Sequence, residues 1–124
     1  MSKQLVVLIV DDDMINRKLL RSILSKNQDV KEIVEAQNGV DAIEQMRLRT
    51  DVNLILLDII MPLMNGLEML EIIRADRQTD HIPIIVLTTD ETKKAKSLEL
   101  GANGFLMKPI RNGELMQKID SLNL

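Results

Sequence analysis

Four short apolar runs in this sequence each end on side chains that could do chemistry. The run Leu54–Leu57 ends on Asp58, and Pro62 stops the chain after three more apolar residues. A run of strand length without polar alternation is typical of a strand buried on both faces, as in a parallel sheet covered by helices. The last residue of such a strand marks the edge where open α/β sheets bind ligands.

The other three runs end on groups that complement a carboxylate. They are Leu5–Val10 before Asp11-Asp12-Asp13, Ile84–Leu87 before Thr88-Thr89-Asp90, and Phe105–Met107 before Lys108-Pro109. An isolated aspartate after a strand is more often a turn or cap residue. Because parallel strands bring all four endings to one edge of a sheet, their coincidence favours a functional site.

The acidic residues Asp11–Asp13 and Asp58 would repel one another in a shared crevice. A hard divalent cation relieves this repulsion, and carboxylate, carbonyl and water ligands suit Mg²⁺. Calcium is the alternative metal, although no loop has the ligand density of a calcium site. We expect one aspartate, Asp12 or Asp13, to cap the helix that follows.

Lys108 and Thr88 would add a positive charge and a hydroxyl at the same edge. Taken singly, they are a surface lysine and a strand-end threonine. A phosphoryl oxygen needs such groups once a metal holds another of its oxygens. The set therefore predicts phosphoryl transfer to Asp58, whose carboxylate would act as a nucleophile and form an aspartyl phosphate.

The elements that must position these residues alternate along the chain, strand then helix, five times. The expected strands are Leu5–Val10, Val30–Ala36, Leu54–Asp58, Ile84–Leu87 and Gly104–Met107. The expected helices are Met14–Leu24, Val40 to about Arg49, one containing Leu67, Leu70 and Ile73, Glu91–Leu100 before a capping Gly101, and Asn112–Leu122. The face of the first helix expected to be buried comprises Ile15, Leu19, Leu20, Ile23 and Leu24.

Right-handed crossovers between these strands predict a three-layer α/β fold with helices on both faces of a parallel sheet. We expect a flavodoxin-like (βα)5 fold with strand order 2-1-3-4-5. In that order the first and third strands are neighbours at the topological switch point, so that Asp11–Asp13 and Asp58 share one crevice. A chain of 124 residues is expected to form one domain, residues 1–124.

Composition argues against several function classes. The chain has no cysteine, which excludes thiol chemistry, and its net charge of −3 with Phe105 as the only aromatic residue leaves no platform for nucleic acid. No apolar run approaches membrane-spanning length, and Met1-Ser2-Lys3-Gln4 leads directly into the first strand. We therefore expect no signal peptide, no membrane association and a cytoplasmic location. His81, the only histidine, precedes Pro83 in a turn, which argues against histidine phosphotransfer.

The whole set of residues resembles the receiver domain of bacterial response regulators, of the chemotaxis-regulator type, over essentially the entire chain. The resemblance is carried by Val10-Asp11-Asp12, Asp58-Ile59-Ile60-Met61-Pro62 with Asn65-Gly66, Thr88, and Lys108-Pro109. It implies that Asp12, Asp58 and the backbone carbonyl of Ile60 hold Mg²⁺, with Asp11 acting largely through water. Asp13 lies beyond this acidic pair and is then the candidate for the helix cap. The resemblance also implies a phosphoacceptor switch, not a classical enzyme, that receives its phosphoryl group from a histidine kinase or a histidine phosphotransfer protein.

The same resemblance implies a switch. Thr88 would supply the switch hydroxyl, and Phe105 would turn inward when that hydroxyl moves to the phosphoryl group. Plain core packing is the alternative interpretation of Phe105. A downstream protein would bind the last helices and strand, around Ala95–Leu100, Phe105 and Asn112–Met116. The peptide between Lys108 and Pro109 is usually cis in this family.

Three positions are expected to control how water reaches the acyl phosphate. Ile60 has an apolar side chain that cannot orient water, and Asp90 is too short to reach far across the opening. Thr89 stands where the family usually has alanine, serine or glycine, and it narrows the opening further. We therefore expect slow loss of the phosphoryl group.

Two other functions fit part of the pattern. A haloacid-dehalogenase-type phosphatase also uses a strand-end Asp-x-Asp, matched by Asp11 and Asp13, but Met14-Ile15 replaces the Gly-Thr that should follow. Such phosphatases normally need a longer chain as well. A flavin-binding module is compatible with the fold, but three aspartates after the first strand would repel the flavin phosphate.

Overall fold

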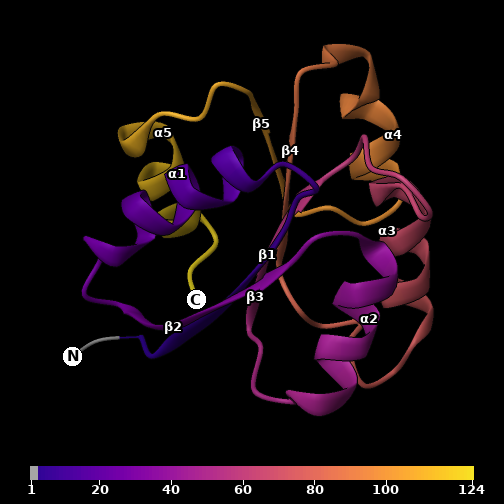
Figure 1. The fold of residues 1–124 in the computed structure, drawn as a ribbon, viewed down its shortest axis with the longest axis horizontal. Helices are drawn as coiled ribbons and strands as arrows, with labels where there is room; N and C mark the ends of the chain where they lie inside the picture. The colour runs from indigo at the N-terminus through magenta and orange to yellow at the C-terminus, as the bar shows by residue number, and fades with distance from the viewer. Residues whose placement is uncertain (1–2) are drawn as a thin grey trace.

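The computed structural model describes residues 3–124 and consists of a parallel five-stranded sheet covered by helices on both faces (Figure 1). The strands are β1 (Leu5–Val10), β2 (Val30–Ala36), β3 (Leu54–Asp58), β4 (Ile84–Thr88) and β5 (Gly104–Met107). The helices are α1 (Met14–Ser25), α2 (Gly39–Leu48), α3 (Gly66–Ala75), α4 (Lys94–Glu99) and α5 (Asn112–Ser121), with a 3-10 turn, η1 (Glu91–Lys93), before α4. The strand order is β2-β1-β3-β4-β5, which confirms the expected flavodoxin-like topology.

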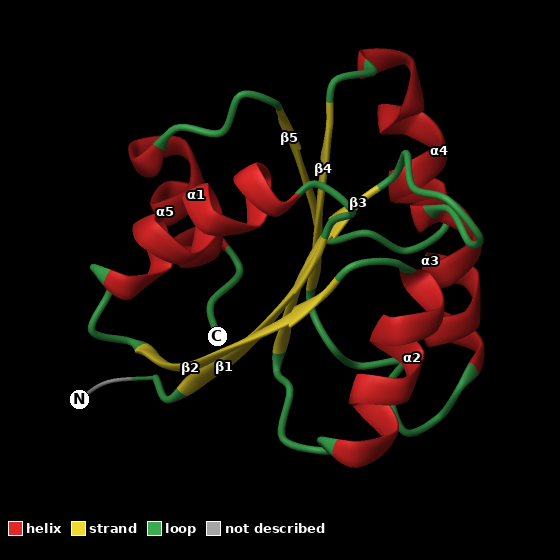
Figure 2. Ribbon diagram, viewed as in Figure 1, coloured by secondary structure: helices red, strands yellow, loops and turns green. Residues whose placement is uncertain are grey.

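Helices α1 and α5 cover one face of the sheet, and α2, α3 and α4 cover the other (Figure 2). Successive side chains of a strand point to opposite faces, so β1 contributes to a core on each side. Leu5, Val7 and Ile9 pack toward α1 and α5, while Val6, Leu8 and Val10 pack toward α2 and α3. Burial on both faces explains why the central strands read as unbroken apolar runs.

Helix α1 differs from the expectation on its buried face. Ile15 is 72% exposed and Leu19 is 41% exposed, whereas Leu20 and Leu24 are buried as predicted. The predicted burial of Ile15 and Leu19 was wrong because the buried face of this helix includes Arg17, which lies three residues before Leu20 on the same face. The Arg17 side chain is largely buried and bonded to neighbouring elements, as described below.

The segment before β5 also differs from the expected single helix over Glu91–Leu100. It begins with the 3-10 turn η1, and α4 has only six residues. Asp90 causes the tight start, because its carboxylate accepts hydrogen bonds from the backbone and the hydroxyl of Thr92. Gly101 ends the helix as expected, with φ of 108° in the left-handed region that favours glycine.

The helices of the described part of the chain, residues 3–124, include none that is both long and apolar enough to span a bilayer. The predicted entry of the chain into the first strand falls partly on Met1 and Ser2, which lie outside the described residues.

Candidate functional site

Three carboxylates meet where β1 and β3 end. Asp11 follows β1 and Asp58 ends β3, and the two strands pair directly, with Val10 opposite Leu57. Carboxylate oxygens of Asp11, Asp12 and Asp58 lie within 4.8 Å of one another. Asp11 and Asp58 are buried, at 1% and 5% exposure, and Asp12 is exposed at the mouth of the cluster. The convergence predicted from the strand endings is therefore confirmed for Asp11, Asp12 and Asp58, but not for Asp13.

Asp13 is the helix cap and not a member of this cluster. Its Oδ1 accepts a hydrogen bond of 2.8 Å from the backbone N–H of Ile15, the second residue of α1. An aspartate in this position satisfies an amide that the first turn of the helix would otherwise leave unpaired. The structure thus selects Asp13 over Asp12 as the cap and leaves Asp12 free to face Asp11 and Asp58.

Lys108 reaches into the cluster from the loop after β5. Its Nζ lies 2.8 Å from Oδ2 of Asp11 and 3.3 Å from Oδ1 of Asp58, and only 13% of its side chain is exposed. Its backbone N–H donates to the carbonyl of Thr88 at 2.8 Å, so the end of β4 fixes where this lysine begins. The Lys108–Pro109 peptide is cis, as the resemblance implied. Lys108 is not a solvated surface lysine.

The electrostatics of the cluster show a shortage of positive charge. Burial raises the pKa of the Asp58 carboxyl to about 6, and the charge of Asp11 adds to the rise, while Lys108 opposes it. Burial lowers the pKa of Lys108, but its hydrogen bond and charge interactions with Asp11, and those with Asp58, outweigh this and raise the pKa overall. The cluster therefore has one ammonium, bonded to Asp11 and Asp58, against three carboxylates, and a further cation could balance the remaining negative charge.

The donor set fits a hard divalent cation. Carboxylate oxygens are the ligands that Mg²⁺ prefers, and the exposed Asp12 leaves a side of the cluster open for the waters that Mg²⁺ retains. Ile60, whose carbonyl the resemblance assigned to the metal, lies two residues beyond Asp58 with its side chain exposed. Asp11, Asp12 and Asp58 are therefore the residues that could hold Mg²⁺ together with this loop.

The loop after Asp58 is held by glycine and by a helix cap. The N–H of Gly66 donates to the carbonyl of Ile59 at 2.8 Å. A Cβ at position 66 would lie 2.3 Å from the carbonyl oxygen of Asp58, so only glycine allows this approach. Asn65 caps α3 in a reciprocal capping box with Glu68. The start of α3 and the end of β3 are thereby packed backbone against backbone.

Thr88 and the two residues after it lie at the neighbouring strand end. Thr88 is fully buried, and its Oγ1 accepts a hydrogen bond of 3.2 Å from the N–H of Asp90. Thr89 is exposed. Hydrogen bonds from the hydroxyl and then the backbone of Thr92 hold the pKa of Asp90 below its usual value and bind its carboxylate to its own turn. Asp90 is thus engaged locally, in keeping with its predicted inability to reach across the crevice.

Phe105 is partly buried on β5, opposite Val86 of β4, and packs against the core that α2 and α3 share with the sheet. This position fits both interpretations made from the sequence, the core residue and the aromatic switch. His81 lies in an exposed turn, as expected.

Arg17 is the neighbour of the site that the sequence did not reveal. Its Nη1 donates to the backbone carbonyl of Asp11 at 2.7 Å, and its Nε donates to Oε1 of Glu35 at 3.1 Å. A helical wheel offered a signal, because Arg17 shares the stripe of Leu20 and Leu24, where an aliphatic residue is the ordinary choice.

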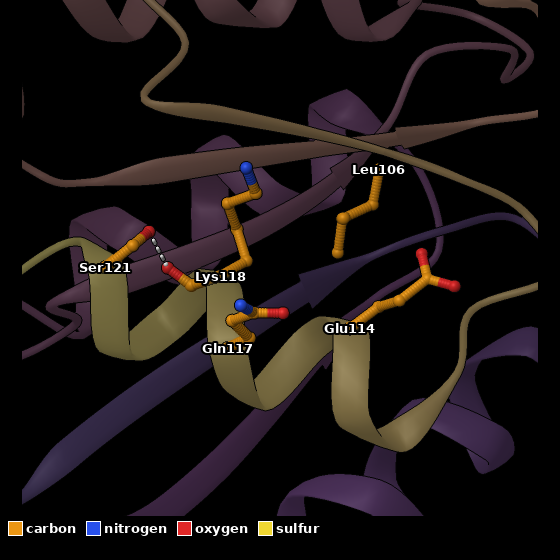
Figure 3. A pocket seen from close by; sticks show the side chains of 5 residues that line it. All are labelled: Leu106, Glu114, Gln117, Lys118 and Ser121. Atoms are coloured by element: carbon orange, nitrogen blue, oxygen red, sulfur yellow. Dashed lines mark hydrogen bonds between the residues drawn. The ribbon is translucent and has the colours of Figure 1, made fainter.

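A separate hollow lies over β5 and α5, away from the acidic cluster (Figure 3). Its lining residues are Leu106, Glu114, Gln117, Lys118 and Ser121. The Ser121 hydroxyl donates to the carbonyl of Lys118 within the same helix at 2.7 Å. This lining contains none of the converging carboxylates, so the hollow is separate from the candidate site at the strand ends.

Comparison with known proteins finds one family model and many relatives. The model of the response regulator receiver domain matches residues 7–120. Chemotaxis protein CheY1 of Helicobacter pylori (strain J99) is 33% identical over 116 residues, which are 92% of this chain and 93% of that protein. Hybrid signal transduction histidine kinase D of Dictyostelium discoideum is 38% identical over 94% of this chain but only 7% of the kinase. The structure of Vibrio cholerae chemotaxis protein CheY4 superposes with a TM-score of 0.85 at 28% identity, covering 95% of this chain and 98% of that one.

Proposed function

The chain belongs to the response regulator receiver domain family of two-component signalling, and on this premise we propose that Asp58 accepts a phosphoryl group and switches a binding surface. The observation that carries the proposal is the buried Asp58 carboxylate at the carboxyl edge of the sheet, paired with Lys108, which also binds Asp11. We propose that residues 1–124 form a single receiver domain that acts in the cytoplasm as a switch and not as a turnover enzyme.

In the proposed reaction an oxygen of Asp58 attacks the phosphorus of a phosphohistidine on a histidine kinase or a histidine phosphotransfer protein. A P–O bond to Asp58 forms as the P–N bond breaks, and the departing imidazole nitrogen keeps the electron pair. Asp58 must be ionised to attack, and a pKa of about 6 leaves most of it ionised near neutral pH. Burial between fixed neighbours supplies the positioning that phosphoryl transfer requires.

Lys108 supplies positive charge where the phosphoryl oxygens arrive. Its ammonium already bridges Asp11 and Asp58, so a short displacement brings it onto a phosphoryl oxygen while it keeps Asp11. We assign Mg²⁺ to Asp12, Asp58 and the carbonyl of Ile60, with Asp11 through water, and when bound it supplies charge neutralisation for the phosphoryl group.

The proposed readout begins at Thr88. Its hydroxyl, which now accepts the N–H of Asp90, would turn to the phosphoryl group and leave space that Phe105 can enter. This exchange would bias two packings of the surface formed by Ala95–Leu100, Phe105 and Asn112–Met116, where a downstream protein would bind.

The alternative, a haloacid-dehalogenase-type phosphatase, needs the two carboxylates of its Asp-x-Asp in one crevice. Here Asp11 is buried in the cluster, whereas the Asp13 carboxylate is exposed and bonded to the N–H of Ile15. The second acid of such an enzyme is therefore committed to capping α1, and this disfavours the phosphatase.

Intact-mass measurement after incubation with acetyl phosphate tests the proposal. The wild-type chain should gain one phosphoryl group in the presence of Mg²⁺, and excess chelator should suppress the gain. Asp58→Asn should gain none, and Asp51→Asn, an exposed aspartate elsewhere on the chain, should behave as wild type. An unmodified wild type, or equal labelling of Asp58→Asn, would refute phosphorylation at Asp58.

A further inference from the structure

Arg17 occupies an inward position of α1 where the helix packs against the end of β1. Its side chain is 15% exposed, and its guanidinium donates to the carbonyl oxygen of Asp11 and to the carboxylate of Glu35 on β2. We infer that Arg17 is a positioning residue, which holds the acidic pair Asp11 and Asp12 in the arrangement that binds a divalent cation. The inference rests on the function proposed above.

Arg17 contacts the peptide group between Asp11 and Asp12. The carbonyl of Asp11 belongs to the planar peptide that joins Asp11 to Asp12. A change in the backbone angle ψ of Asp11 would turn this plane and carry Asp12 with it, so the direction of the Asp12 carboxylate relative to Asp11 depends on how the plane is held. The 2.7 Å bond from Nη1 of Arg17 restrains the plane and thereby the placement of Asp12 relative to Asp11.

Other bonds complete the hold on Asp11 but do not replace Arg17. The Asp11 N–H donates to the carbonyl of Ala36 on β2, and its carboxylate accepts from the N–H of Asp13 and from Lys108. These contacts hold the backbone N–H and the carboxylate of Asp11, but they do not hold the peptide group between Asp11 and Asp12. Among the described residues, it is Arg17 that donates a hydrogen bond to the Asp11 carbonyl.

An arginine suits this place better than a lysine. The two acceptors lie on different parts of the sheet, Asp11 just after β1 and Glu35 on β2, and the planar guanidinium can donate to both from separate nitrogens. A buried cation on a helix face is destabilising unless it is paired and bonded. Glu35 supplies the opposite charge that pairs with Arg17. The guanidinium can therefore remain buried beside the acidic pair and donate hydrogen bonds there, which an aliphatic side chain could not do.

Arg21 provides an internal control one helical turn later. Its Nε donates to the other oxygen of Glu35 at 2.7 Å, and its side chain is 46% exposed. Within residues 3–124, Arg21 donates to Glu35 and to the carbonyl of Ile33, and not to Asp11. The two arginines thus share a helix, a charge and a carboxylate partner, and they differ in the contact to the acidic pair.

The sign of the effect separates positioning from simple electrostatics. Removing a positive charge close to an acidic cluster should strengthen the binding of a cation through space. Removing a residue that orients the ligands should weaken it. Supporting contacts behind metal ligands are typically worth about 10–100-fold in affinity, and we expect about tenfold here because Arg17 acts through the backbone.

The test compares Arg17→Met with Arg21→Met in the full chain, using Mg²⁺ titration followed by backbone amide shifts. Methionine has no donor and is a good helix former. We expect Mg²⁺ binding about tenfold weaker in Arg17→Met and unchanged or slightly tighter in Arg21→Met. In metal-free protein, the Asp13 N–H that donates to Asp11 should exchange with solvent faster in Arg17→Met alone.

Equal Mg²⁺ affinity in the two variants, or tighter binding in Arg17→Met, would overturn the inference. So would unchanged exchange of the Asp13 N–H. If Arg17→Met fails to fold, Arg17→Lys against Arg21→Lys gives the same comparison, because lysine keeps the charge but loses the fork. Absence of Mg²⁺ binding in the wild type would instead refute the proposed function, and the exchange comparison would still decide whether Arg17 orients Asp11.

Discussion

At the carboxyl end of β3, Lys108 faces Asp11 and Asp58, while near its amino end Arg49 faces Glu32 and Asp51. Each cluster places one cation between carboxylates of different elements. The pKa values of the carboxyl groups in the two clusters nevertheless shift in opposite directions. Hydrogen bonds from Arg49 lower the pKa of Glu32 and of Asp51, whereas burial and the charge of Asp11 raise the pKa of Asp58.

The donor geometry and the exposure explain this difference. Arg49 donates to both oxygens of Glu32, at 2.6 and 2.9 Å, and to both oxygens of Asp51, in a region open to water. Lys108 is a point charge in a buried site and cannot satisfy three carboxylates. The Arg49 cluster is electrostatically complete, and the Lys108 cluster is not. The raised pKa of Asp58, in contrast to the lowered pKa values of Glu32 and Asp51, supports the ligand site proposed for the Lys108 cluster.

The strongest way to break this comparison is to remove each cation in turn. Lys108→Met should slow phosphorylation by acetyl phosphate by about 100-fold or more, because the group that meets the phosphoryl oxygens is lost. Arg49→Met should react at the wild-type rate. The rates can be followed by intact mass, with Mg²⁺ binding retained in both variants as the control. Wild-type kinetics in Lys108→Met would show that its charge plays no part in the transfer.

Because the pKa values of Asp58 and Asp51 shift in opposite directions, replacing each aspartate should change the free energy of unfolding with a different dependence on pH. This effect is smaller than the effect on the phosphorylation rate. The pKa of Asp58 in the folded chain, about 6, lies above the reference value of 3.8, so its contribution to stability is present below pH 4 and lost as pH rises through 6. Without metal, Asp58→Asn should therefore be more stable than wild type by about 2 kcal/mol at pH 8, with the gain vanishing near pH 4.

Asp51→Asn serves as the opposite case in the same denaturation series. Its pKa is lowered, so its ionised form favours the folded chain above the reference value, and that contribution fades as pH falls. Asp51→Asn should lose a little stability at pH 8. Urea unfolding at pH 4, 6 and 8 gives both curves, and parallel pH profiles for the two variants would contradict the contrast.

The smallest expected effect concerns access to the phosphoryl group. Ile60 is exposed beside the acidic cluster, and Leu48 is exposed beside Arg49. Ile60→Asn should accelerate loss of phosphate about tenfold by orienting water, while Leu48→Asn should leave the rate unchanged. A phosphate-release time course after donor removal measures both. Unchanged Mg²⁺ affinity in Ile60→Asn would show that the backbone carbonyl at position 60 is unaffected. Equal phosphate-release rates in Ile60→Asn and wild type would exclude control of water access by the Ile60 side chain.

The strand ends could be predicted because they depend on local patterns. An apolar run such as Leu54–Leu57 is buried on both faces, and parallel strands bring Asp11, Asp58 and Lys108 to one edge whatever the details of the loops. The exposed Ile15 could not be predicted in the same way. Apolar periodicity predicts that Ile15 is buried, but hydrogen bonds to Asp11 and to the distant Glu35 hold Arg17 on the inward side of the helix, and periodicity does not reveal such bonds.

The start of α4 was missed for a related reason. Glu91 has ordinary helical character, but the side chain of Asp90 bonds Thr92 and tightens the first turn into a 3-10 conformation. The helical pattern alone narrowed the cap of α1 to Asp12 or Asp13, since both can fill the role chemically. The resemblance, which assigns Asp12 to the metal, favoured Asp13, and the structure shows Asp13 in the cap.

The approach of Gly66 to the carbonyl of Asp58 also has a consequence for mutational tolerance. A single added methyl group would have to displace the backbone of the acceptor residue, although α3 itself gains helix propensity when glycine is replaced. Because displacing that backbone costs more than the helix propensity gained, a variant library screened only for folded protein should already retain glycine at position 66. Selection for stability and selection for signalling would therefore both keep glycine there.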